Sequence, residues 1–505
     1  MLVADVSPIA ALAPRGHARP LRAPAEEPRW LAELLEAQNG AELVSAWARG
    51  ILAGNLPRSR EHLVRQLNHY VAGIDAAVTR QVNAVIHDPR FQRLEARWRG
   101  LRYLVEQIPE DANVKVRMLN VSWKALVRDL DKAIEFDQSQ LFLKVYCGEF
   151  GISGGEPFSV LLGDYEIRLG PSPGSPMDDI DALRRISEAA AAAFAPFIAA
   201  AHPSLLGLDR FTELERPQNL QIVFEQPELA KWRSLRQRDD SRFLALVLPR
   251  MLMRPVYPDD GSLSCSFRFR EETNSTSGET NLWGNAAYAY GAVLIRAFAE
   301  TGWLADIRGV RRDAQTSGLA PGLATPWFET DRAGLVPKGP LEVMIPDILE
   351  PELADLGFLT LCRCQDTECA AFYSSSSIQK PKTYNDPLAT ANAKIGTLLQ
   401  YILSVSRVAH YVKVLGRDKI GTLAEPEDIS RFLTHWIRQY VSTSSDLPAE
   451  ERAKYPLRDA NVVVRQQQGR PGVYACVIYM EPYLQFDRVA AGIRLTTELA
   501  QVAQA

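Results

Sequence analysis

The sequence predicts a mixed α/β protein with more than one domain. At 505 residues the chain is longer than one hydrophobic core usually supports, so two or three domains are expected. Apolar residues recur at helical spacing through most of the first hundred residues, whereas short runs after them alternate apolar and polar residues as strands do. The C-terminal part combines a long helical pattern with further strand patterns.

Composition narrows the class of protein further. Hydrophobic residues make up 46% of the chain and charged residues 23%, as in ordinary water-soluble proteins, and the net charge of -4 does not favour nucleic acid as a partner. The longest apolar run, 189–201, contains Pro196 and is too short to cross a bilayer. The N-terminus lacks the basic start and apolar core of a signal peptide. We therefore expect a cytoplasmic protein without membrane insertion, whose six cysteines are reduced.

The N-terminal part predicts a tail followed by helices. Residues 1–29 are rich in Ala, Pro and Arg without periodicity, which predicts a disordered tail. Residues 30–110 predict a helical region, in which one helix ends near Asp88 and the next covers 90–108. Gly100 costs that last helix about 1 kcal/mol relative to Ala, which we interpret as room for a neighbouring backbone. Its apolar stripe, expected to pack on one side, is Phe91, Leu94, Trp98, Leu101 and Val105.

Residues 111–375 predict a mixed α/β domain. Apolar residues alternate over 114–118 as in a strand, and Ser122 is suited to cap a helix whose buried face runs from Trp123 to Ile134. The other elements predicted here are strands over 141–146, 243–248, 263–269, 341–345 and 358–362, and helices over 179–201 and 281–302.

Residues 376–505 predict a C-terminal domain built on one long helix. Asp386 can cap it with Pro387 at its first position, and apolar residues then follow at steps of three and four from Leu388 to Leu415. Such a helix would be about 44 Å long at ~1.5 Å per residue. The remaining elements predicted here are a helix over 425–440 and strands over 461–465, 473–480 and 493–499.

One pattern is compatible with a hydrolase. Residues 151–155 fit the G-x-S-x-G motif of a nucleophile elbow, with Ser153 as nucleophile and His202, His410 or His435 as base. That elbow needs a strand that ends at the serine, whereas the strand pattern stops several residues earlier, so a glycine-rich loop is the better interpretation.

The cysteines offer one pattern that resembles a metal site. Cys362, Cys364 and Cys369 have the spacing C-x-C-x4-C, but no fourth ligand completes a tetrahedral set. If 358–364 is a strand, Cys362 and Cys364 lie on one face and are packing residues. We assign no catalytic, cofactor-binding or metal-binding residue.

Four longer runs carry a resemblance to a known family. They occur in the family's order and together extend over roughly residues 60–499. These runs are FQRLEARWRGLRYLV (91–105), GGEPFSVLLGDYEI (154–167), LWGNAAYAYGAVLIRAFAETGWLADIRGV (282–310) and QKPKTYNDPLATANAKI (379–395). With them the chain resembles the large contractile-sheath subunit of type VI secretion systems, the TssC/VipB family.

The resemblance implies a structural protein with a contractile-tail-sheath-like fold and no cofactor. In that family the large subunit pairs with a small sheath subunit, TssB, and the pairs stack in helical rings around an inner tube of Hcp above a baseplate. Contraction drives the tube outward, and the unfoldase ClpV recycles the spent sheath. A sheath of a phage-tail-like particle is the nearer alternative, and the Ser153 hydrolase is an alternative of a different class.

The resemblance also implies where partners bind. The position-matched helix for the unfoldase is 30–37, with Leu31, Leu34 and Leu35 as contacts. The C-terminal strands are expected to exchange between neighbouring subunits, so that 492–499 and 473–480 form an intermolecular sheet. From the apolar pattern, we expect either the seam of the helix over 388–415 or the helix over 283–298 to bury against the small sheath subunit. The candidate interface residues are Trp283, Tyr290, Leu398, Ile402, Val473, Tyr474, Val477, Ile493 and Leu495.

Overall fold

The computed structural model divides the chain into two compact units. The larger unit comprises Met1–Val6, Arg93–Pro255 and Ser275–Ala505, and the smaller unit comprises Ser7–Gln92 and Val256–Asn274. The structure describes residues 2–4, 33, 36–52, 59–152, 154–171, 177–216, 219–258, 267–273, 280–310, 317–326, 339–364, 369–419, 426–442, 454–466, 473–482 and 493–500. No helix in these ranges is long and apolar enough to cross a membrane.

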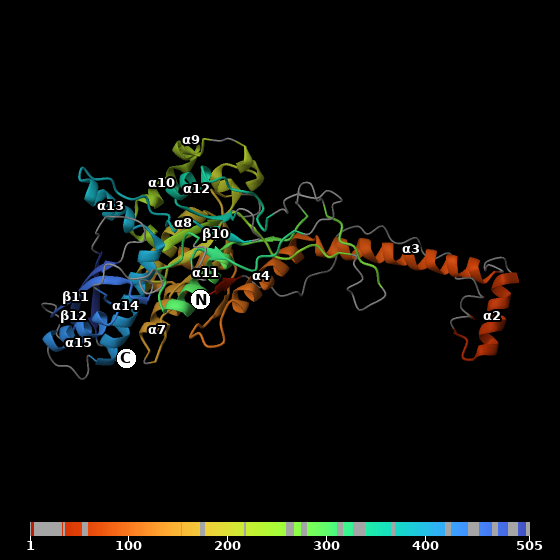
Figure 1. Cartoon of the computed structure of the whole chain (residues 1–505), viewed down its shortest axis with the longest axis horizontal. Helices are drawn as coiled ribbons and strands as arrows, with labels where there is room; N and C mark the ends of the chain where they lie inside the picture. The colour runs from red at the N-terminus through yellow and green to blue at the C-terminus, as the bar shows by residue number, and fades with distance from the viewer. Residues whose placement is uncertain are drawn as a thin grey trace. The chain divides into compact units, whose positions relative to one another are not determined.

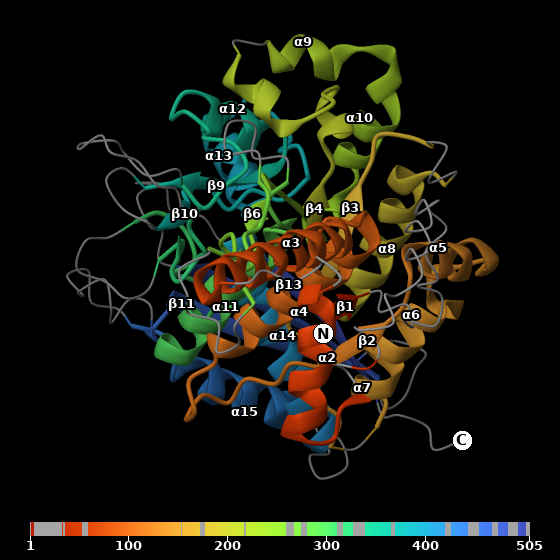
Figure 2. The ribbon, with the colours of Figure 1, turned by 90° about the vertical axis from the view of Figure 1, so that its right-hand side faces the viewer.

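An eight-stranded sheet forms the centre of the larger unit, with strand order β2-β1-β3-β4-β5-β9-β10-β8. Figure 2 shows β9 and β10 of this sheet on one side and β1 and β2 on the other. The strands from β2 to β9 are parallel, whereas β10 runs antiparallel to both β9 and β8. Their bounds are β1 Leu2–Ala4, β2 Met118–Asn120, β3 Leu161–Ile167, β4 Phe197–Ala201, β5 Leu244–Leu248, β8 Leu319–Ala320, β9 Phe358–Arg363 and β10 Ala370–Phe372.

Helices cover both faces of this sheet because successive strand residues point to opposite sides. Leu161 and Leu246 belong to one core, and Leu162 and Val247 to the other. The helices of the first core are α5 Trp123–Lys132, α8 Asp179–Ala193, α9 Leu220–Glu225, α10 Ala230–Gln237 and α12 Leu349–Asp355. Those of the second core are α4 Pro89–Glu106, α11 Ala287–Thr301 and α14 Leu399–Lys419. The predicted mixed α/β class is confirmed.

The first residues of the chain form part of this sheet. β1 lies between β2 and β3 and is parallel to both. The prediction of a disordered tail over 1–29 is therefore wrong for residues 2–4. Residues 5–29 lie outside the described part of the chain.

Helix α4 buries a different face from the one predicted. Its buried residues are Ala96, Gly100 and Leu104, whereas Trp98 is 50% exposed and Val105 48% exposed. A Cβ on Gly100 would lie 2.5 Å from the ring of Tyr288, so the small side of the helix permits close packing on α11. The predicted apolar stripe is wrong, and a side chain rather than a backbone approaches Gly100.

The predicted strand over 141–146 is also wrong, because this segment is helical. The helical turns are α6 Gln140–Phe142, a π-helical turn Leu143–Cys147 and α7 Gly148–Phe150. Phe142, Tyr146 and Phe150 recur every four residues, and their neighbouring rings lie 4.9 and 4.8 Å apart. This aromatic spacing is the helical signal that the apolar alternation obscured.

Several other predictions hold in part. Ser122 caps α5 by accepting a hydrogen bond from the Ala125 amide, but Ile134 is 88% exposed. The strand predicted over 114–118 begins only at Met118. The helix predicted over 179–201 ends at Ala193 and is followed by β4.

The region around 281–302 and the short strands beside it also differ from prediction. α11 begins at Ala287, whose amide donates to the Asn285 side chain, and Gly302 is its left-handed C-cap. The residues before it form β7 Trp283–Gly284, paired with β6 Met251–Leu252. The strand predicted over 341–345 is reduced to one bridge between Leu341 and Met251.

The single long helix predicted over 388–415 is wrong, because the structure contains two helices there (Figure 1). α13 Pro387–Ile395 is capped by Asp386 as predicted, and Gly396 ends it. The Leu399 amide then donates to the carbonyl of Ser375, and the Ser377 amide donates to the carbonyl of Thr397. These tertiary bonds replace helical bonds and separate α13 from α14.

The C-terminal residues form a second, antiparallel sheet. Its order is β11-β12-β13, and α14 and α15 share one apolar core with β11 and β12. The bounds are α15 Pro426–Arg438, β11 Leu457–Gln466, β12 Val473–Pro482 and β13 Ile493–Ala500. The predicted helix over 425–440 and the three predicted C-terminal strands are confirmed.

The smaller unit contains α2 Gly40–Leu52 and α3 Arg60–Ile86, the latter a continuous helix (Figure 1). Arg270 and Glu272 contact its C-terminal half: the Asn83 side chain donates to the Arg270 carbonyl and accepts from the Glu272 amide. The Glu271 carboxylate accepts a hydrogen bond from the Tyr257 amide, and its Oε1 lies 3.2 Å from His87 Nε2. Residues 267–269 are not in a strand, and the rest of the strand predicted over 263–269 lies outside the described ranges.

Candidate interaction surfaces

The histidines of the hydrolase hypothesis are a capping residue, a buried residue and an exposed residue. Ser153 lies outside the described residues. His202 caps the turn after β4 by accepting the Ser204 amide, and its pKa is lowered by burial. His410 lies with Nε2 3.0 Å from a carbonyl at the end of α8, and burial lowers its pKa to about 4. His435 is exposed on α15. His202 therefore caps a turn, and His410 packs in the interior of the protein.

The cysteine cluster is a packed hairpin. Cys362 and Cys364 are buried, and the Cys364 amide donates to the carbonyl of Cys369. Burial raises the pKa of the Cys362 thiol to about 12. Among the described residues, no three His, Cys, Asp or Glu side chains lie together so as to hold a metal ion.

Three of the predicted interface residues are covered by their own chain. Tyr290 is fully buried, with its ring 4.9 Å from that of Phe372, and Ile402 is 6% exposed in the same core. Tyr474 is buried in the C-terminal core. These three side chains offer no surface to a partner in this conformation.

The other predicted interface residues lie nearer the surface or in the C-terminal strands. Trp283, Leu398 and Val477 are half-buried. Val473 begins β12, and Ile493 and Leu495 have their backbone in β13. Their contact with a partner stays a prediction.

The C-terminal sheet leaves one face of its central strand outward. Tyr474, Cys476, Ile478 and Met480 of β12 are buried in the C-terminal core. On the opposite face Tyr479 is 46% exposed. β11 and β13 are the two outer strands of the three described here. Outer strands present unpaired backbone groups, so this sheet is suited to pairing with another chain.

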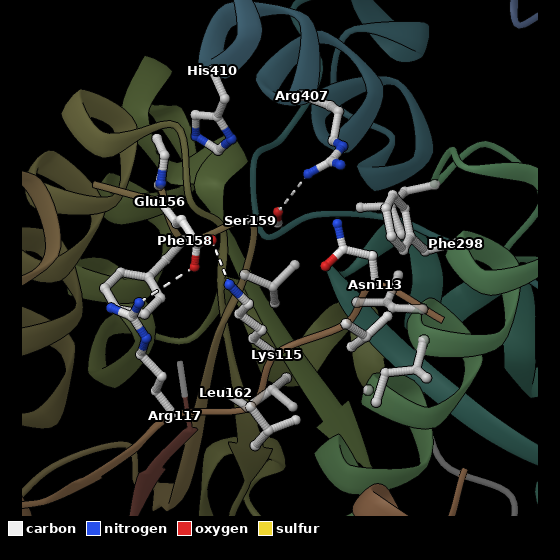
Figure 3. A pocket seen from close by; sticks show the side chains of 18 of the residues that line it. Asn113, Lys115, Arg117, Glu156, Phe158, Ser159, Leu162, Phe298, Arg407 and His410 are labelled. Atoms are coloured by element: carbon white, nitrogen blue, oxygen red, sulfur yellow. Dashed lines mark hydrogen bonds and ion pairs between the residues drawn. The ribbon is translucent and has the colours of Figure 1, made fainter. Parts of the chain in front are cut away.

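A groove lies beside the N-terminal ends of β2 and β3 in the larger unit (Figure 3). It encloses 420 Å³ between residues 113–117, which precede β2, and residues 155–160, which precede β3. Its apolar lining comes from α4, β3 and α11, and α14 contributes Arg407, His410 and Tyr411. The apolar side chains from those three elements are Leu104, Leu162, Leu294, Ile295 and Phe298.

Ion pairs join the two walls of the groove. Lys115 pairs with Glu156, and Figure 3 shows both Lys115 and Arg117 directed at Glu156. Arg117 also pairs with Glu149, and its Nη2 lies 3.5 Å from Glu156 Oε2. The Lys115 ammonium lowers the pKa of the Glu156 carboxyl. All but Glu149 are exposed, so solvent weakens these pairs and they can open.

Arg407 of α14 completes the rim. Its guanidinium lies 4.5 Å from the centre of the Phe298 ring and 4.8 Å from that of Tyr411. It donates to the Ser159 hydroxyl at 3.3 Å and to the Tyr411 hydroxyl at 2.7 Å. A cation held by aromatic faces and neutral hydroxyls retains most of its positive potential at the groove.

Strand β3 carries two acidic residues whose pKa values are shifted in opposite directions. Burial raises the pKa of the Asp164 carboxyl to about 6, although Arg97 lies 3.0 Å away and opposes the shift. Burial would also raise the pKa of Glu166, but two hydrogen bonds from Arg250, of 2.6 and 3.0 Å, lower it overall. Asp164 is therefore the carboxyl of this strand that protonates most readily.

We expect Asp164→Asn to gain stability relative to wild type as pH rises. A carboxyl whose pKa is higher in the folded state than its unfolded value of about 3.9 contributes stability that is complete at low pH and lost as pH rises through 6. Asparagine cannot ionise, so the difference in unfolding free energy, variant minus wild type, should rise by about 2 kcal/mol between pH 4 and pH 7.

Urea unfolding across this pH range measures that difference. The matched control is Asp181→Asn: burial would raise the pKa of Asp181, but Arg184 and Arg185 lower it overall. Its difference should run in the opposite direction. A flat difference for Asp164→Asn would contradict the prediction.

Comparison with known proteins assigns the chain to a family. Residues 68–379 match the EvpB/VC_A0108 tail sheath N-terminal domain, and residues 388–499 match the EvpB/VC_A0108 tail sheath gpW/gp25-like domain. The chain is 38% identical over 445 residues to a protein of Pseudomonas aeruginosa (strain PAO1) named type VI secretion system sheath protein TssC1. The aligned part is 88% of this chain and 87% of that protein. This chain belongs to the EvpB/VC_A0108 tail sheath family.

Membership confirms the resemblance inferred from the four sequence runs and the role of a type VI secretion sheath subunit. The sheath N-terminal domain match includes the strands of the main sheet from β2 to β10. The gpW/gp25-like match includes α13, α14, α15 and most of the C-terminal sheet. β1 precedes both matched segments.

The groove was missed from the sequence, although a signal for one wall was present. Val114 and Val116 alternate with Lys115 and Arg117, which predicted a strand. The structure places Val114 and Val116 half-buried and the two basic residues exposed, but no strand is formed over 113–117. The alternation thus correctly identified an extended segment with one apolar face whose neighbour in the sheet was not visible from sequence.

Proposed function

We propose that this chain is the large sheath subunit that pairs with a TssB-like small subunit and builds a helical sheath around an Hcp tube on a baseplate. The single observation that carries this proposal is the 38% identity to TssC1 across 88% of the chain. Energy stored as the extended lattice forms would be released when the subunits repack, which needs no cofactor or catalytic residue in this chain. The cytoplasm is the proposed location of the working sheath.

Lattice contacts in this proposal come from the C-terminal sheet. β12 and β13 pair over eight residues within one chain, and residues 483–492 connect them. The same register can form between β12 of one chain and β13 of a neighbour, because antiparallel pairing depends on the strands and not on their connection. Backbone pairing of this kind survives large rotations, since it requires little side-chain packing between the bodies it joins.

The unfoldase is the partner expected to recycle the contracted sheath. Its proposed contacts Leu31, Leu34 and Leu35 lie outside the described residues. Binding of ClpV to contracted sheath should fall at least tenfold for Leu34→Asp combined with Leu35→Asp. Unchanged binding would assign recycling to another segment.

Co-expression tests the proposed pairing. The chain expressed alone should aggregate, because half-buried apolar side chains such as Leu398 and Val477 stay partly exposed to water when the small subunit is absent. Co-expressed with the small sheath subunit it should give a soluble complex or tubules in negative-stain micrographs. A stable, monodisperse monomer that ignores the small subunit would refute the proposal.

A further inference from the structure

The position of β1 marks a slot one strand wide in the main sheet. Leu2 is paired with Met118 on one side and Leu162 on the other, and Val3 with Leu119 and Gly163. Neighbouring strands lie about 4.8 Å apart, so β2 and β3 are separated by about 9.6 Å at this level. Of the residues that the structure describes, Leu2–Ala4 fill the slot.

The groove continues this slot along the strand direction. Residues 113–117 lead into β2 and residues 156–160 lead into β3, and the groove lies between them. Because β2 and β3 are both parallel to β1, their upstream segments extend the same two walls. No backbone hydrogen bond joins 114–116 to 157–159 within the described residues. An added strand needs extended backbone on each side for hydrogen bonds and an apolar surface for every second side chain, and the groove offers both.

We propose that the groove and the position of β1 form one binding site for an extended segment of the small sheath subunit, which enters parallel to β2 and β3 and displaces Leu2–Ala4. This inference rests on the proposed pairing with that subunit. The segment would lie alongside residues 113–120, which comprise one wall of the groove and β2. It would therefore be about eight residues long, or about 26 Å at ~3.3 Å per residue.

The lining specifies the chemistry of that segment. Every second side chain would face Leu104, Leu162 and Phe298, so the segment should alternate apolar residues with others. The rim carries the cations of Lys115, Arg117 and Arg407 against the carboxylates of Glu149 and Glu156. This excess of positive charge favours an acidic residue among the outward side chains of the segment.

A second copy of this chain is a poorer occupant. Its Leu2–Ala4 would take the same register beside Leu119 and Gly163 and would leave the groove as it is. A longer segment fills both parts and makes more backbone hydrogen bonds than the three residues it replaces, which is why displacement is favourable.

Cross-linking of β1 tests its displacement. In the variant Val3→Cys with Leu119→Cys the paired Cα atoms lie about 4.8 Å apart, within the range of a disulfide. The chain alone, kept soluble by a protein fused at its C-terminus, and the co-expressed complex are oxidised with diamide, and the disulfide-linked peptides are measured by mass spectrometry. We expect the intramolecular disulfide in the chain alone and at least tenfold less of it in the complex.

Two further measurements separate an exchangeable β1 from a permanent strand. Val116→Cys in the groove wall should react with a maleimide at least tenfold more slowly in the complex, whereas Ile134→Cys, 88% exposed in the free chain, should not change. Deleting Leu2–Ala4 should leave the yield of the soluble complex unchanged or raise it, because it removes a competitor.

The outcomes that overturn the inference are distinct. Equal disulfide formation and equal Val116→Cys labelling in a complex that forms normally would show that β1 stays in the sheet. Loss of the complex on deletion of Leu2–Ala4 would show the same. A disulfide between two copies would replace the small subunit by a second chain as the occupant. If wild-type protein forms no complex, the proposed pairing itself fails and this inference fails with it.

Discussion

Deleting residues 491–505 should abolish long sheath tubules while the pair of large and small subunits still forms. The deletion removes β13, which pairs with β12 from Val473↔Ala500 to Met480↔Ile493. β12 keeps its pairing with β11, and its inward side chains remain under α14 and α15. The C-terminal domain should therefore fold, but no strand is left to exchange with a neighbouring subunit.

Negative-stain microscopy and size-exclusion chromatography of the co-expressed proteins measure the two properties separately. We expect at least a tenfold loss of tubules longer than a few rings and no loss of the soluble pair. A shorter deletion of residues 501–505 keeps the whole of β13 and is the matched control. Tubules of normal length after the longer deletion would show that β13 is a closing strand of its own domain.

Local patterns predicted those elements whose neighbours lie close in sequence. The strands β11, β12 and β13 alternate apolar residues and follow one another, and Ser122 has its capping partner three residues away. Helix α15 has one apolar face that its own domain covers. In each case the pattern and the partner are both local, so periodicity and capping rules were sufficient.

The failures occur where distant residues decide the structure. The bond from the Leu399 amide to Ser375 interrupts an otherwise continuous helical pattern. Strand β1 depends on neighbours more than a hundred residues away in β2 and β3. No pattern within residues 2–4 could have predicted it, because a strand of three residues has no periodicity of its own.

The predicted interface residues show the same limit of local sequence patterns. Periodicity correctly found that Tyr290 and Ile402 lie on apolar helix faces, but these faces are covered by the same chain. A pattern shows which side of a helix avoids water and not whether the covering surface is intramolecular. The groove needed the structure because its two walls, 113–117 and 155–160, meet only through the sheet.

Trp232→Ala should destabilise the protein far more than Trp98→Ala, although the sequence pattern marked Trp98 as a packing residue. Trp232 is fully buried beside β9, and its ring stacks on Phe358 at 5.6 Å with an interplanar angle of 11°. Removing a buried tryptophan leaves a cavity and costs about 3–5 kcal/mol of unfolding free energy. Trp98 is 50% exposed on α4, so its loss should change that free energy by about 0.5 kcal/mol or less.

Urea unfolding followed by tryptophan fluorescence measures the unfolding free energy of each variant, with both variants prepared as soluble protein in the same way. Trp232→Phe serves as the conservative control, because a phenyl ring keeps much of the stacking on Phe358 and should recover at least half of the loss. The face of α4 that packs is the one with Ala96, Gly100 and Leu104, so Gly100→Leu, placed against the ring of Tyr288, should be far more damaging than Trp98→Ala. A loss for Trp98→Ala as large as that for Trp232→Ala would restore the apolar stripe as the packing face of α4, because an exposed tryptophan has no buried contacts to lose.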